Sequence, residues 1–169
     1  MTEQTTKDLL EYDDQGKAIM PSGINVLTIL TFIWCSISAI LILCTPMINK
    51  WLLGTMDKTV ASGQELSAKR LADMEKARAA IELSNQNMIP LIAIGIAGVI
   101  LCFVGALWMR KFKKDGYWMY VAGELAPVLG SFLVIGTAQY TSIWSYVLGI
   151  GIPVLFVILY TMQRKYLTK

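Results

Sequence analysis

Four long stretches of this chain contain almost no charged residue, and they limit its possible folds more than any other feature. Each has 21 to 25 residues, and together they cover residues 22–46, 88–109, 117–137 and 142–162. A helix needs about 20 apolar residues to cross the hydrocarbon core of a bilayer. Because backbone groups in lipid must be hydrogen-bonded within their own segment, each stretch is predicted to be helical. The sequence therefore predicts an all-α polytopic membrane protein with four transmembrane helices.

The remaining residues form the segments outside these spans. They are a polar tail (residues 1–21), a long loop (47–87), a basic loop (110–116), a short loop (138–141) and a basic end (163–169). The tail lacks the basic start and short apolar core of a secretory signal, so the first span is expected to be an uncleaved anchor.

Basic residues next to the spans predict the orientation. Four of them follow the second span within RKFKK, and QRK follows the fourth span. Cytoplasmic loops carry an excess of lysine and arginine, which places both termini in the cytoplasm and the 47–87 loop outside it. We expect the protein in the inner membrane of a bacterium, with Tyr160 among the aromatic residues at the inner interface.

The 47–87 loop is predicted to be an extracytoplasmic helical hairpin. Its first arm continues from the first span through Pro46, with apolar residues four apart, and the chain turns at residues 61–63. A capping box, Ser62-x-x-Glu65, is predicted to start the second arm. The two apolar stripes are expected to face each other: Ile48, Leu52, Met56 and Val60 against Leu71, Met74 and Ile81. The alternative places residues 51–53 flat in the membrane interface as an anchor.

Composition argues against several classes of function. The chain has no histidine, and its three cysteines lie within spans without a CxxC pair. These features indicate no zinc motif or disulfide framework. No catalytic constellation, cofactor or metal site is expected, and the protein is predicted not to be an enzyme. A net charge of +3 is too small to indicate a nucleic-acid partner.

Small residues predict how the first two spans pack. The second span has a face of small side chains, formed by Gly95, Gly98, Cys102 and Gly105. The first span repeats that spacing with Thr28, Thr31, Cys35 and Ser38. Such faces allow close helix approach in lipid, so both are expected to point inward. The alternative is a cavity lined by the polar residues Thr28, Thr31 and Ser38.

Prolines interrupt the third and fourth spans. Pro127 and Pro153 each remove one backbone hydrogen bond, which frees the carbonyls of Gly123 and Gly149. Kinks are therefore expected near the middle of both spans. Paired broken helices at this depth are one indication of a transporter site.

Glu124 is an acid inside the third span. Intramembrane ionisable groups usually face the bundle interior and have a partner. The first interpretation is a neutral acid that pins the third span to another helix, through Thr31 or Thr28, with Tyr160 as the next choice. The second is a proton or cation site built from Glu124, the Gly123 carbonyl and neighbouring groups, with Tyr120 one turn away.

Two functions follow from these features. The preferred one is a non-catalytic accessory or scaffold subunit that contacts lipid and a protein partner, through the 47–87 loop or the 1–21 tail. The alternative is a small proton- or cation-coupled transporter that uses Glu124. The size and the single membrane glutamate are similar to the small multidrug transporters, but that family carries its glutamate in the first span, so the similarity is one of fold only.

The layout also resembles a broader group. The segment PSGINVLTILTF at residues 21–32, followed by a charged helical loop and three further spans, resembles small uncharacterised four-span bacterial membrane proteins. This resemblance implies the layout and no activity.

Overall fold

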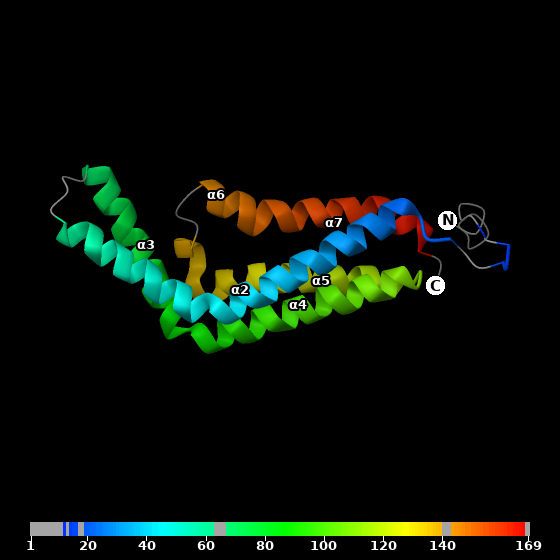
Figure 1. The fold of residues 1–169 in the computed structure, drawn as a ribbon, viewed down its shortest axis with the longest axis horizontal. Helices are drawn as coiled ribbons and strands as arrows, with labels where there is room; N and C mark the ends of the chain where they lie inside the picture. Colours follow the sequence, from blue (N-terminus) through cyan, green and yellow to red (C-terminus); the bar gives the residue numbers. More distant parts are fainter. Residues whose placement is uncertain (1–11, 13, 17–18, 63–66, 140–142, 168–169) are drawn as a thin grey trace.

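The structure is a computed structural model, and four of its helices are long and apolar enough to cross a membrane. It describes residues 12, 14–16, 19–62, 67–139 and 143–167. The four helical segments are Ser22–Ala61, Met88–Arg110, Lys114–Ile135 and Val147–Tyr166. The predicted all-helical fold with four such helices is confirmed (Figure 1).

Helix α2 (Ser22–Ala61) is much longer than a membrane span. It starts directly after Pro21, whose backbone is extended, and Pro46 lies inside it without ending it. At about 1.5 Å per residue its 40 residues measure roughly 60 Å. The hydrocarbon core of a bilayer is about 30 Å thick, so α2 is about twice as long as a helix needs to be to cross it.

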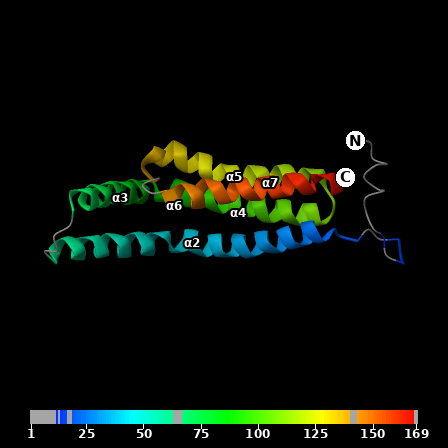
Figure 2. The ribbon, with the colours of Figure 1, turned by 90° about the horizontal axis from the view of Figure 1, so that it is seen from above.

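Helix α3 (Ala68–Gln86) runs back beside the second half of α2, and Figure 2 shows the two helices side by side. An ion pair of 2.7 Å joins Arg78 to Asp57, and Asn49 donates a 2.8 Å hydrogen bond to Asn85. Arg78 also contacts Glu82 at 3.1 Å. The 47–87 loop therefore contains two antiparallel helical arms, which we call the hairpin.

Two predicted details of the hairpin are wrong. Helix α3 begins at Ala68 with Ser67 as its N-cap, while Ser62 is the C-cap of α2 and its hydroxyl donates to the Thr59 carbonyl. Residue 65, the other half of the predicted capping box, lies outside the described residues. Ser67 accepts a hydrogen bond from the Arg70 backbone N–H, which satisfies one of the unpaired donors at the helix start.

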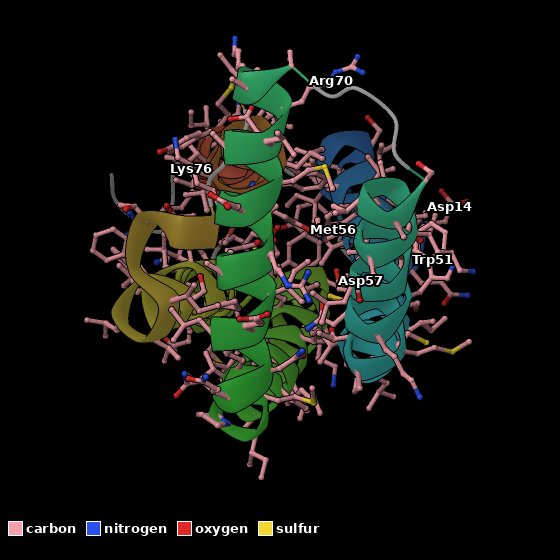
Figure 3. All side chains as sticks on the ribbon, turned by 90° about the vertical axis from the view of Figure 1, so that its left-hand side faces the viewer. Asp14, Trp51, Met56, Asp57, Arg70 and Lys76 are labelled. Carbon is pink, nitrogen blue, oxygen red and sulfur yellow. The ribbon has the colours of Figure 1, made fainter. Side chains whose placement is uncertain are left out.

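The faces of the two arms also differ from the prediction. Leu52, Met56, Met74 and Ile81 are half-buried as expected, but Ile48, Val60 and Leu71 are exposed. The buried residue near the hairpin base is Asn49, because its amide pairs with Asn85. Figure 3 shows Met56 and Asp57 between the arms and Trp51 on the side away from α3.

Helices α4 (Met88–Arg110) and α5 (Lys114–Ile135) form the most extensive helix contact in the described part of the chain. A tight turn joins them, in which Phe112 has a positive φ of 58° and the Lys113 N–H donates to the Trp108 carbonyl. Helix α5 ends at Ile135, and its C-cap is Gly136, whose φ of 69° suits glycine.

The last span combines several short elements. After η1 (Gly136–Gln139) come α6 (Ile143–Tyr146), the π-helical segment η2 (Val147–Gly151), α7 (Ile152–Gln163) and η3 (Arg164–Tyr166). The Ile152 N–H reaches back to the Val147 carbonyl, five residues earlier. This wider turn lies directly before Pro153, where the regular hydrogen-bond pattern is interrupted.

The bundle core lies in the half nearest Ser22 and Tyr166, which we call the closed half. Its buried side chains include Ile24, Leu27, Met109, Tyr117, Tyr120, Tyr160 and Leu167. The Gln163 side chain lies against Gly23, since a methyl group added there would be 2.8 Å from its Cδ. The start of α2 and the end of α7 therefore lie at the same end of the bundle (Figure 1).

Candidate functional site

Glycine pairs hold α4 and α5 in direct backbone contact. A methyl group added to Gly105 would lie 2.7 Å from the Gly116 carbonyl oxygen, and one added to Gly116 would lie 2.7 Å from the Gly105 carbonyl. Gly98 and Gly123 form a second pair of the same kind, at 2.9 and 2.8 Å. The two pairs are seven residues apart on each helix, so the helices meet without intervening side chains.

The predicted face Gly95, Gly98, Cys102 and Gly105 is buried, and three of its members pack against α5. Gly95 instead lies against Ile42 of α2. Helix α5 carries a matching series of glycines, Gly116, Gly123 and Gly130. This series was not predicted, although its seven-residue spacing is visible in the sequence.

Pro127 has no N–H, so it leaves the Gly123 carbonyl without its helical donor. This carbonyl lies against Gly98 of α4. Pro127 contacts the same glycine, since a methyl group on Gly98 would lie 2.5 Å from Pro127 Cγ. The proline and the carbonyl it frees therefore take part in helix packing. This contact is different from the predicted cation site, in which that carbonyl acts together with Glu124.

Glu124 is half-buried, and its Oε1 accepts a 2.7 Å hydrogen bond from the Tyr120 hydroxyl. Tyr120 is one turn earlier on the same helix, so this bond fixes the carboxyl without joining two helices. The prediction of an interhelical hydrogen bond from Glu124 to Thr31, Thr28 or Tyr160 is wrong, because the partner of Glu124 is Tyr120. Tyr120 was correctly placed beside the acid.

Thr31 and Tyr160 make the interhelical bond instead. Their hydroxyls lie 2.8 Å apart and join α2 to α7, while the Tyr160 ring packs on the Tyr120 ring with centroids 4.4 Å apart. Thr28 donates to the Asn25 carbonyl on its own helix. Tyr160 is only 1% exposed and belongs to the core, so its predicted position at the membrane interface is wrong.

The opposite half of the bundle, nearest the hairpin, is hollow. A cavity of about 530 Å³ lies between α2, α4, α5 and the last span. Ser84 lines it at the hairpin base, whereas Cys35 and Cys102 also belong to the closed half. We call Cys35, Cys102 and Glu124 the floor of the cavity, because they lie where the hollow half meets the core.

The cavity walls contain both internal prolines, although α5 continues as one helix through Pro127. Pro127 lines it from α5, and Gly149 and Pro153 line it from the last span. Trp34, Ser38 and Thr45 line it from α2. The structure thus brings Glu124, Gly123 and both prolines to one cavity, while Thr28 and Thr31 are not among its lining residues.

The cavity walls are mostly apolar, and their chemistry is limited. Glu124 is the one carboxylic acid among the described lining residues, which include no lysine or arginine. Among the described residues, no group of three or more histidine, cysteine, aspartate or glutamate side chains is placed to hold a metal ion. Such a cavity can hold an apolar body and one polar or charged group at the floor.

Comparison with protein-family models, with curated proteins and with solved structures gave no match for this chain.

Proposed function

We propose that this chain is a non-catalytic integral membrane protein that acts as an accessory or scaffold subunit of a larger membrane assembly. The hairpin supports this proposal more than any other feature of the structure. Helix α3 has no buried residue, although an ion pair and a hydrogen bond fix it against α2. The exposed residues of this ordered helix, among them Leu71 and Lys76, form a surface suited to contact with another protein.

The orientation proposed from the sequence is supported by the positions of the basic residues. Lys113 lies over the Trp108 ring at 5.1 Å, and Arg164 lies over the rings of Tyr117 and Trp118 at 5.3 Å. These groups gather at the closed end of the bundle, opposite the hairpin. In a bacterial inner membrane this end would face the cytoplasm, and the hairpin would face outward.

Isolation of the protein from its native membrane tests the accessory role. A tagged chain extracted in mild detergent is expected to carry one partner protein in a fixed ratio to itself. A double variant of α3, Leu71→Glu with Lys76→Glu, should lose that partner because both residues are exposed on the proposed contact surface. Leu133→Ala changes an exposed residue of α5 and is the matched control, so this variant should keep the partner protein. Recovery of the chain alone or only as multiples of itself would contradict the proposal.

A second function, a small proton- or cation-coupled transporter, is favoured by the cavity, which is lined by Glu124 and by one proline from each of two helical segments. Proline-interrupted helices that face a common site are one indication of a transporter. Uptake by reconstituted protein that Glu124→Gln abolishes, with the fold unchanged, would establish this function.

A further inference from the structure

The cavity in the hollow half is about as deep as one leaflet of a bilayer. Its lining residues run from Trp34 to Thr45 on α2 and from Leu91 to Cys102 on α4, which is eleven residues along each helix. At about 1.5 Å per residue, both runs measure roughly 17 Å. The hydrocarbon core is about 30 Å thick, and Trp34 lies in the middle of the first apolar stretch, residues 22–46. The cavity therefore lies at the depth of the acyl chains of the leaflet on the hairpin side.

The cavity opens sideways between α2 and the first half of the last span. Helix α7 packs against α2, as in the bond between Thr31 and Tyr160, and it also packs against α5. Within the described residues, α6 and η2 make extensive contacts only with neighbouring elements of the last span. Trp34 and Leu41, which line the cavity from α2, are 38% and 51% exposed. A lipid chain can therefore enter from the side without leaving the hydrocarbon core.

The width and the walls of the cavity favour a single hydrocarbon chain as its occupant. Over a depth of roughly 17 Å, the volume of about 530 Å³ corresponds to a mean width of about 6 Å. A helix with its side chains is about 10–12 Å wide, so a helix of another protein does not fit. Leu41, Ile42 and Ile94 are among the apolar side chains of the wall. Apolar cavities stay free of water and bind apolar molecules, which restore the packing contacts that an empty space lacks.

We infer that the cavity holds one acyl chain of a phospholipid from the leaflet on the hairpin side. The chain lies along Ile42 and Ile94, and the headgroup stays outside the bundle at the hairpin end, where Thr45 and Ser84 line the cavity. Binding depends on shape and apolar contact and needs no charge on Glu124. The site goes beyond the accessory role, because it requires neither a partner protein nor transport.

A photoreactive lipid tests this inference. The purified full chain is reconstituted into phosphatidylcholine liposomes that contain a small share of phosphatidylcholine with a diazirine near the middle of one acyl chain. After illumination, mass spectrometry of the peptides locates the adducts. Adducts are expected on Ile94 and Val128, which line the cavity, as well as on Leu133, which is exposed on the outside of α5. Adducts confined to the outer surface of the bundle would overturn the inference, because no lipid chain would then enter the cavity.

Two substitutions of the same kind on α2 distinguish the cavity from the outer surface. Ser38→Phe places a ring in the cavity and is expected to reduce the adducts on Ile94 and Val128 at least tenfold relative to those on Leu133. Ser36→Phe is the matched control and should leave this ratio unchanged, because Ser36 is exposed and does not line the cavity. An unchanged ratio in Ser38→Phe would refute the site. These outcomes do not depend on whether a partner protein is recovered from the membrane.

Discussion

Gly105→Ala is expected to destabilise the bundle, although alanine normally favours a helix. The added methyl group would lie 2.7 Å from both the Gly116 carbonyl oxygen and the Tyr120 backbone nitrogen. Both neighbours are backbone atoms, so α4 and α5 would have to separate. Overpacking of a close contact usually costs about 1–3 kcal/mol.

Gly54→Ala is the matched control for this substitution. Gly54 lies inside α2, and a methyl group there meets no atom within 4 Å. Replacing glycine by alanine in a helix interior gains about 0.5–1 kcal/mol at either position, so the difference between the two variants isolates the packing cost. The measurement is the free energy of unfolding in mixed micelles. If Gly105→Ala is as stable as Gly54→Ala, the glycine pairing of α4 and α5 is wrong.

Tyr160→Ala is expected to cost about 3–5 kcal/mol, the usual range for deleting a buried aromatic side chain. The residue is 1% exposed, its ring packs on Tyr120, and its hydroxyl bonds to Thr31. Removing it would open the closed half where α2, α5 and α7 meet. The same unfolding measurement in mixed micelles gives the loss of stability.

Tyr160→Phe separates the contribution of the ring to stability from that of the hydroxyl. It keeps the contact with Tyr120 and removes only the bond to Thr31. Hydrogen bonds between membrane helices average about 0.6 kcal/mol, so this variant should be much closer to the unchanged protein than Tyr160→Ala. Equal losses in the two variants would show that the hydroxyl bond, and not the packed ring, holds the closed half together.

The sequence predicted the helical elements because their signals are local. Ser22 follows a proline, the second apolar stretch starts at Met88, and α4 and α5 are separated by a short basic turn. Length and the absence of charge were enough to predict four helices that could cross a membrane. The pair Arg78–Glu82 in the structure has the i, i+4 spacing of such local signals.

Contacts between helices were harder to predict, because they depend on how each helix is rotated about its axis. Thr31 was an expected partner of Glu124, yet Thr31 pairs with Tyr160 and Glu124 pairs within its own helix. Tyr160 was assigned to the interface because tyrosine is common there, but its ring fits against Tyr120 in the core. The helix cap was misassigned because Ser62 and Ser67 are both acceptable caps in sequence.

The cavity could not be predicted from composition. Its walls come from five helical segments, and most of its lining residues are apolar side chains with no distinguishing pattern. The two prolines were predicted to kink their spans, but only the packing of α5 and the last span places Pro127 and Pro153 on the same cavity.

The central claim is a membrane bundle that is closed at the cytoplasmic end and hollow towards a hairpin on the outer side. Single cysteines at positions 68 and 114 test it most directly, in a chain whose Cys35, Cys44 and Cys102 have been replaced by alanine. Both Ala68 and Lys114 are exposed, and Ala68 is preferred to Ser67 because Ser67 caps α3.

The measurement is labelling of intact spheroplasts by a membrane-impermeant maleimide, with permeabilised cells as the control in which both positions react. The account predicts labelling at position 68 and none at position 114 in the intact spheroplasts. Labelling at position 114 with protection at position 68 would contradict it, because the hairpin would then face the cytoplasm.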